Sequence, residues 1–156
     1  ASLTKLMTAM VILDAKLPLK EKIEITREDR DLVKLTGSRL HYGATLSREE
    51  ILALALLSSD NRAAAALART YPGGKAAFVK AMNQKAKALH MHQSHFVDAT
   101  GLEPENMASP ADLARMVIAA SRYPLIREIT TQRMQDVRPY KRKGPLRFVN
   151  TNRLLR

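Results

Sequence analysis

The sequence predicts a mixed α/β (α+β) domain with a mostly helical middle portion and an antiparallel sheet that is incomplete within these 156 residues. Two observations lead to this expectation. Apolar residues recur at helical spacing in five segments, which proline, glycine or capping residues separate. The alternation that is typical of strands occurs only in residues 22–26 and from about 132 to 148.

Length and composition predict a single domain, or a piece of one. The chain is 46% hydrophobic and can bury one core, but not two large ones. No apolar run approaches the roughly 18 residues that a membrane-spanning helix needs. Cysteine is absent, which excludes a disulfide framework and a thiolate metal site. No signal peptide is visible, so localisation has to be inferred from function.

The helical segments have recognisable ends. The first runs from Ser2 to about Ala15 and stops before Pro18. The second begins at Ser47, where Glu50 completes a capping box, and its residues 51–57 are apolar on all sides, as in a central core helix. The others are expected at Asn61–Arg69, at about 75–89, and from the cap Ser109 to Tyr123-Pro124.

The net charge of +11 is concentrated towards the C-terminal end. Residues 133–156 hold eight basic side chains and one acidic one, and residues 132–148 are expected to form a hairpin around Lys143-Gly144-Pro145. A nucleic-acid-binding strip would carry interleaved stacking aromatics or lie on a recognition helix, and this segment does neither. We therefore expect no nucleic-acid partner, and a solvated hairpin with an attraction to anionic polymer or membrane surfaces.

Ser2-Leu3-Thr4-Lys5 is the first group of residues that can carry chemistry. Residues three apart share one face of a helix, so the Ser2 hydroxyl and the Lys5 amine are neighbours. An amine buried beside a hydroxyl loses charge stabilisation, its pKa falls, and it can accept the serine proton. On spacing alone, the alternative is an N-capping serine followed by a surface lysine.

Ser59-Asp60-Asn61 is the second group, at the junction between two predicted helices. On its own it is explained by helix capping, because these three residue types are the most favoured at N-caps. The combination is more informative, since Ser-x-x-Lys followed by Ser-x-Asn is the motif pair of class A β-lactamases and penicillin-binding proteins.

The chain resembles the low-molecular-mass penicillin-binding proteins, the D-alanyl-D-alanine carboxypeptidases and endopeptidases, over nearly its whole length. The resemblance is nearest to the DD-endopeptidase branch, and it implies a serine β-lactamase/DD-peptidase-like fold. It is carried by residues 1–10 and 56–64 around the two motifs, by Phe96-Val97-Asp98-Ala99-Thr100-Gly101-Leu102, by Ser109-x-x-Asp112-Leu113-Ala114, by Asn150-Thr151-Asn152-Arg153-Leu154-Leu155, and by Tyr71-Pro72-Gly73-Gly74 with Lys80-Ala81-Met82-Asn83.

The resemblance implies an enzyme that cleaves D-alanyl peptide bonds of peptidoglycan through an acyl-serine. Ser2 would be the nucleophile and Lys5 its base, Ser59 would relay a proton to the leaving amine, and Asn61 would bind the substrate backbone. The Ser2 N–H would supply half of an oxyanion hole. The implied partners are peptidoglycan peptide stems and β-lactam inhibitors, with no metal or organic cofactor, and the implied location is the periplasm.

One departure from the family pattern concerns the third motif. A Lys-Thr-Gly sequence is absent, and Lys143-Gly144-Pro145 stands before the Asn-Thr-Asn segment instead of after it. The strands expected before the nucleophile helix are absent as well. We therefore expect residues 1–156 to be part of a penicillin-binding domain, with the third motif outside them.

Three alternatives stay open on sequence. A class A β-lactamase would need a glutamate in a Glu-x-x-Leu-Asn context, which Glu103-Pro104-Glu105-Asn106 only partly matches. A non-catalytic wall-binding protein would follow if the third motif were missing altogether. A metal site at His90, His92 and His95 is disfavoured, because no carboxylate except Asp98 stands at matching spacing. The sequence does not distinguish endopeptidase from carboxypeptidase.

Overall fold

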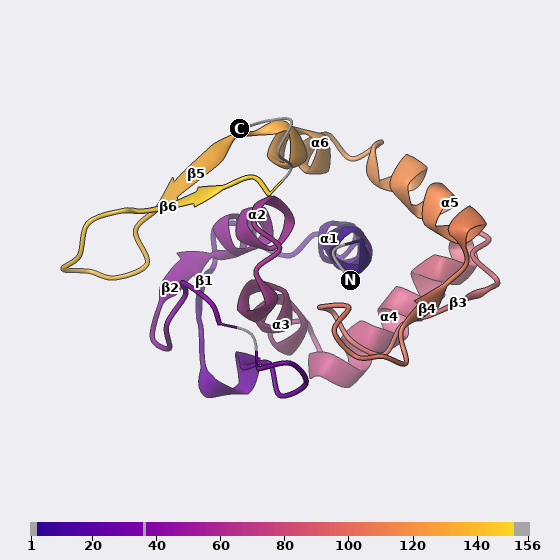
Figure 1. The fold of residues 1–156 in the computed structure, drawn as a ribbon, viewed down its shortest axis with the longest axis horizontal. Coiled ribbons are helices and arrows are strands. Elements are labelled where there is room, and N and C mark those ends of the chain that lie inside the picture. Colours follow the sequence, from indigo (N-terminus) through magenta and orange to yellow (C-terminus); the bar gives the residue numbers. More distant parts are fainter. Residues whose placement is uncertain (1–2, 36, 152–156) are drawn as a thin grey trace.

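The computed structural model describes residues 3–35 and 37–151, and within these ranges six α-helices pack around one core, while the short 3-10 helix η1 (Arg27–Asp29) and short strands lie at the edges (Figure 1). Helix α1 (Thr4–Asp14) lies in the middle of this arrangement. It packs against α2 (Arg48–Leu57), α3 (Asn61–Arg69), α4 (Gly74–Ala88) and α5 (Pro110–Ala120). The first helix is therefore enclosed on most sides.

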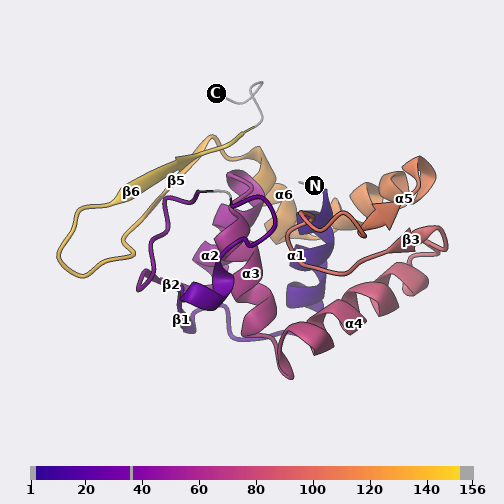
Figure 2. The same ribbon diagram turned by 60° about the horizontal axis from the view of Figure 1, so that its bottom comes forward.

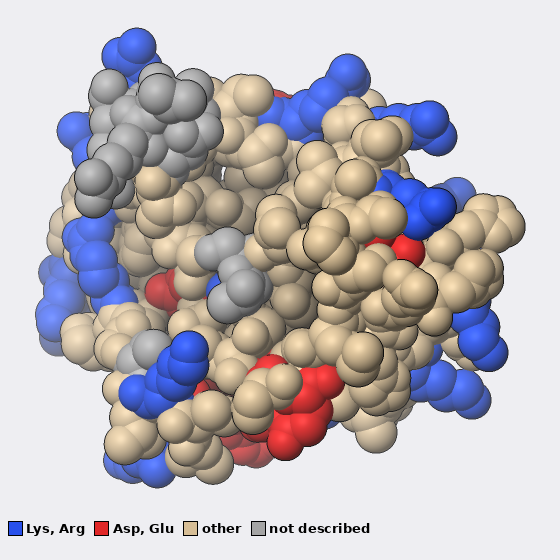
Figure 3. All heavy atoms as spheres, turned by 45° about the vertical axis from the view of Figure 1, so that its right-hand side comes forward, with Lys and Arg blue, Asp and Glu red and all other residues tan. Residues whose placement is uncertain are grey.

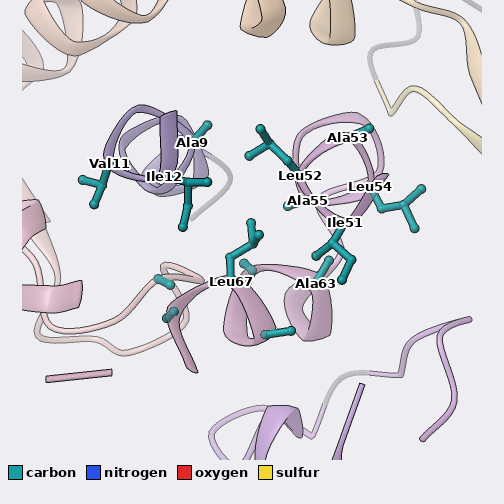
Figure 4. Packing of buried hydrophobic residues seen from close by; sticks show 14 of the residues in the cluster. Ala9, Val11, Ile12, Ile51, Leu52, Ala53, Leu54, Ala55, Ala63 and Leu67 are labelled. Carbon is teal, nitrogen blue, oxygen red and sulfur yellow. The ribbon is translucent and has the colours of Figure 1, made fainter. Parts of the chain in front are cut away.

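The core forms where α1, α2 and α3 meet (Figure 4). Ile12, Leu52 and Leu67 point into the space between the three helices, and each is at most 1% exposed. The alanines of α3 allow a close approach, and Ala63 lies opposite Ile51 of α2. Interdigitated apolar side chains thus fix the relative positions of the helices that carry the two motifs.

The remaining elements lie around this core. Helix α6 (Pro124–Thr131) packs on α2. Three antiparallel pairs complete the fold, namely β1 (Lys22–Glu24) with β2 (Thr45–Ser47), β3 (Ser94–His95) with β4 (Met107–Ala108), and β5 (Met134–Val137) with β6 (Leu146–Val149). The loop that joins β5 to β6 extends away from the helices in both ribbon views (Figures 1 and 2).

Most of the helix predictions are confirmed. Ser47 and Glu50 form the expected capping box at α2, with Ser47 Oγ accepting from the Glu50 N–H at 3.1 Å. Ser109 caps α5 with Pro110 in its first turn. The C-terminal hairpin also forms as expected, with Asp136 opposite Arg147.

The expected end at Tyr123-Pro124 is wrong. Helix α5 already stops at Ala120, and Pro124 begins α6 instead of only ending a helix. Proline fits the first helical turn, where its missing N–H would have no intrahelical partner anyway. Strand β2 and the β3–β4 pair were not predicted either.

None of the helices in the described part of the chain has the length and hydrophobicity needed to cross a bilayer.

Candidate active site

Lys5 lies in the first turn of α1 and is buried, with 3% of its surface exposed. Its Nζ donates a hydrogen bond to the Thr100 carbonyl oxygen at 3.2 Å. One turn further on, Thr8 Oγ1 donates to the Ala99 carbonyl at 2.8 Å. Two side chains of α1 therefore anchor consecutive carbonyls of the loop before α5.

The environment of Lys5 shifts its protonation equilibrium towards the neutral amine. Burial lowers the pKa of the amine from its ordinary value, and the negative charges of Asp60 and Asp98 offset part of that effect. The surface-lysine alternative is therefore wrong. An amine with a lowered pKa can accept a proton at a pH where an exposed lysine stays charged.

A network centred on Asp98 holds the loop that contacts Lys5. The Asp98 carboxylate accepts hydrogen bonds from the N–H groups of Thr100 (3.2 Å) and Gly101 (3.1 Å), and from the Thr100 hydroxyl. Asn106 closes the loop, because its Oδ1 accepts from the Val97 N–H at 2.8 Å and its Nδ2 donates to Asp98. The Thr100 carbonyl that meets Lys5 is thus fixed from its own loop.

The second motif occupies the turn between α2 and α3. Ser59 has a left-handed backbone, with φ of +53°, and directly follows the C-cap of α2. Asp60 caps α3, since one carboxylate oxygen accepts from the Ala63 N–H at 2.9 Å and the other accepts from Ser38 Oγ at 2.7 Å. Helix capping therefore accounts for an aspartate at position 60. The negative charge of Asp60 also raises the pKa of Lys5.

Asn61, the first residue of α3, lines a cavity of about 580 Å³. Asp98, Thr100 and their neighbours in the same loop also line this cavity. The loop whose Thr100 carbonyl accepts from Lys5 therefore lines the same cavity as Asn61. Of the predicted site residues in the described ranges, Asn61 lines this cavity, whereas Lys5 and Ser59 do not.

Ser2 lies outside the described residues, so the predicted contact between Ser2 Oγ and Lys5 Nζ stays a prediction.

The hydroxyl of Ser58 has a structural contact, in contrast to the proton relay proposed for Ser59. Its Oγ donates to the Val149 carbonyl at 2.9 Å, and the Thr151 N–H donates to the Leu57 carbonyl at 3.0 Å. The end of α2 thus holds the end of β6.

The supporting residues Thr8, Asp98 and Asn106 were not assigned a role from the sequence. Asp98-Ala99-Thr100-Gly101 carried a local signal, because an aspartate often bonds the backbone two or three residues further on. The partner Asn106 lies eight residues away, and no such rule identifies it. Asn106 belongs to the segment that partly matched a β-lactamase glutamate loop, and here it closes the loop next to Lys5.

His90, His92 and His95, which follow α4 in the chain, are exposed. The rings of His90 and His92 meet edge to face, with centroids 5.8 Å apart. Within residues 3–35 and 37–151, no three histidine or acidic side chains gather in a way that could hold a metal ion.

Comparison with known proteins identifies relatives of the whole chain. A sequence profile described as D-alanyl-D-alanine carboxypeptidase matches residues 1–156. A D-alanyl-D-alanine endopeptidase of Escherichia coli (strain K12) is 47% identical over 156 residues, which cover 99% of this chain and 50% of that protein. One from Pseudomonas aeruginosa (strain PAO1) is also 47% identical, over 155 residues with the same shares. The chain spans about half the length of these curated relatives.

Comparison with solved structures leads to the same group of enzymes. The crystal structure of the Streptomyces K15 DD-transpeptidase superposes with a TM-score of 0.88 at 27% identity, covering 99% of this chain and 64% of that one. A D-alanyl-D-alanine carboxypeptidase from Mycobacterium tuberculosis H37Rv gives a TM-score of 0.84 at 28% identity, with 99% and 58% covered. The expected DD-peptidase-like fold is confirmed. The chain belongs to the D-alanyl-D-alanine carboxypeptidase family, that of the low-molecular-mass penicillin-binding proteins.

Proposed function

We propose that the protein is a serine DD-peptidase that cleaves D-alanyl peptide bonds of peptidoglycan through an acyl-serine, with endopeptidase favoured over carboxypeptidase activity. The observation that supports this most is the buried Lys5 amine, whose pKa is lowered and which stands three residues after Ser2. The 47% identity to two endopeptidases supports the choice of bond.

The proposed reaction has two steps. Ser2 Oγ attacks the D-alanyl carbonyl carbon while Lys5 takes the hydroxyl proton, and the bond to the leaving amine breaks as Ser59 relays a proton to that amine. Water then attacks the ester in the same manner and releases Ser2. Asn61 binds the peptide backbone, and the Ser2 N–H stabilises the negative charge that develops on the carbonyl oxygen.

β-Lactams fit the same chemistry as covalent inhibitors, because their ring amide acylates the serine. We place the protein in the periplasm, where its substrate lies. We also propose a peripheral contact between the β5–β6 hairpin and an anionic cell-envelope surface. Exposed cations at the hairpin end support this contact, namely Arg138, Lys141, Arg142 and Lys143.

The choice of bond is tested with two purified substrates, a cross-linked peptidoglycan dimer and an uncross-linked pentapeptide monomer. We expect the full-length protein to cleave the dimer faster, and Ser2→Ala to cleave neither. Release of terminal D-alanine alone would instead make it a carboxypeptidase. Failure to cleave either substrate or to react with penicillin would favour the wall-binding alternative, and rapid hydrolysis of penicillin would favour a β-lactamase.

A further inference from the structure

Asn83 of α4 holds the backbone of Phe96 by two hydrogen bonds. Its Oδ1 accepts from the Phe96 N–H at 2.9 Å, and its Nδ2 donates to the Phe96 carbonyl at 2.8 Å. These are the two bonds that a residue of a neighbouring antiparallel strand would make. Phe96 itself is buried. The side chain of Asn83 therefore fixes the start of the segment 96–101, which includes the carbonyl that Lys5 contacts.

Thr8 of α1 holds the same segment near its other end. Thr8 is fully buried, and its Oγ1 donates to the Ala99 carbonyl at 2.8 Å. That carbonyl belongs to the planar peptide unit that joins Ala99 to Thr100, and the Thr100 N–H of the same unit donates to Asp98 at 3.2 Å. Both polar groups of this peptide plane are thus held. The direction of the next carbonyl, that of Thr100, is restricted in consequence.

The direction of the Lys5 amine depends on the Thr100 carbonyl. Lysine and arginine side chains are spread around the margin of the face shown in Figure 3, at the surface of the molecule. Lys5 is buried instead, and its Nζ donates to the Thr100 carbonyl at 3.2 Å. A lysine carries its amine on a flexible four-carbon stem, so the amine takes its position from the groups that it bonds. A shift of the Thr100 carbonyl would therefore move the amine.

We propose that Thr8 and Asn83 are positioning residues for acylation, because they hold the Thr100 carbonyl that directs the Lys5 amine. The inference rests on the proposed function, in which Lys5 accepts the proton of the nucleophile. Both residues act through the segment 96–101 and not on the substrate. Asn83 holds the start of this segment, and Thr8 holds the carbonyl that directly precedes the Lys5 contact.

Two substitutions of Thr8 separate the effect of its hydroxyl from that of its volume. Valine keeps the shape and loses the hydroxyl, whereas serine keeps the hydroxyl and loses a methyl group. The acylation rate of the full-length protein is measured at rising penicillin concentration, which gives a limiting rate and a half-saturating concentration. Thr8→Val should lower the limiting rate about tenfold with little change in the half-saturating concentration, because a misplaced base slows chemistry more than binding. Thr8→Ser should keep most of the limiting rate.

A role of Thr8 in packing alone predicts the opposite order. Serine would then be the worse substitution, because it leaves a cavity of the size of a methyl group in the core. Thr130→Val is the matched control, since Thr130 Oγ1 also donates at 2.8 Å, but to the Ile126 carbonyl of its own helix. This variant should leave both kinetic constants unchanged.

Asn83→Ala tests the other end of the segment. It removes both bonds to Phe96 and should also lower the limiting rate by a larger factor than it raises the half-saturating concentration. Circular dichroism shows whether each variant is folded. If Thr8→Val does not fold, the rates of Asn83→Ala decide.

An unchanged limiting rate in folded Thr8→Val or in Asn83→Ala would overturn the inference, and so would a lower limiting rate in Thr8→Ser than in Thr8→Val. A rise in the half-saturating concentration at a constant limiting rate would overturn it as well. Absence of acylation in the unchanged protein would instead refute the proposed function, on which the inference depends.

Discussion

The surroundings of Lys5 differ from those of an ordinary core residue, because they bury an amine. A buried amine loses its hydration, and a methionine or leucine of similar size would fill the same space without that cost. Thr8 and the Asp98 network hold the carbonyl that Lys5 contacts, so the amine has a defined direction. The carboxylates of Asp60 and Asp98 limit how far burial lowers its pKa. This combination suits a proton acceptor.

Asp60→Asn tests the electrostatic part of this account. Asparagine can still accept from the Ala63 N–H and bond Ser38, so the cap is kept while the charge is lost. The negative charge raises the pKa of Lys5, and its removal lowers that pKa further. Lys5 then becomes neutral at lower pH. We expect the acidic limb of the penicillin acylation rate to move to lower pH, measured by stopped labelling across a pH series.

Asp136→Asn is the matched control, because Asp136 is an exposed aspartate that pairs with Arg147 on the hairpin. It should leave the pH profile in place. An unchanged profile in Asp60→Asn, or a shift to higher pH, would contradict the role of Lys5 as the base.

The turn between α2 and α3 places the second motif. A left-handed residue after a helix commonly redirects the chain, and glycine is the usual choice because it has no Cβ. Serine in this conformation costs roughly 1–2 kcal/mol. Such strain at a non-glycine position suggests that the side chain is retained for function.

Ser59→Gly and Ser59→Ala separate function from stability. Both remove the hydroxyl, so both should lose most of the DD-peptidase activity. Only glycine relieves the left-handed strain, so Ser59→Gly should be more stable than Ser59→Ala by about 1 kcal/mol. Chemical denaturation of the two full-length variants measures the difference. Equal stability with full activity in both would remove Ser59 from the proposed mechanism.

Local signals predicted most of the helices and the strands β1, β5 and β6, but they missed β2, β3 and β4. The capping box of Ser47 and Glu50 lies within four residues, so sequence alone reveals it. Strand β2 has only three residues and exists because β1 pairs with it from more than twenty residues away. Helix α6 was missed because Pro124 was interpreted only as an end signal.

The candidate site, too, could be predicted from the sequence only in part. The motifs that include Lys5 and Asn61 were recognisable from residue types and order. The support for Lys5 depends on the pairing of Asp98 with Asn106 and on a carbonyl 95 residues away in the chain. The cavity beside Asn61 does not follow from local spacing, because it forms where α3, α4 and two loops meet.

The described residues form no single large sheet. Residues 3–35 and 37–151 contain three separate two-stranded pairs. Each strand of such a pair has one edge without a strand beside it, and further strands could pair there. We propose that the 156-residue polypeptide by itself neither unfolds in a sharp thermal transition nor cleaves a peptidoglycan dimer. Calorimetry and a cleavage assay on residues 1–156 check this. A sharp transition accompanied by turnover would show that the domain needs neither further strands nor a third motif.

Mass spectrometry of the full-length protein after reaction with penicillin locates the nucleophile directly. The acyl group should be found on Ser2, and Ser2→Ala should carry none. Ser58→Ala should still be labelled, because the Ser58 hydroxyl bonds the Val149 carbonyl and has no proposed catalytic role. An adduct on Ser58, Ser59 or any other residue, or labelling of Ser2→Ala at the normal rate, would contradict the assignment of Ser2 and Lys5.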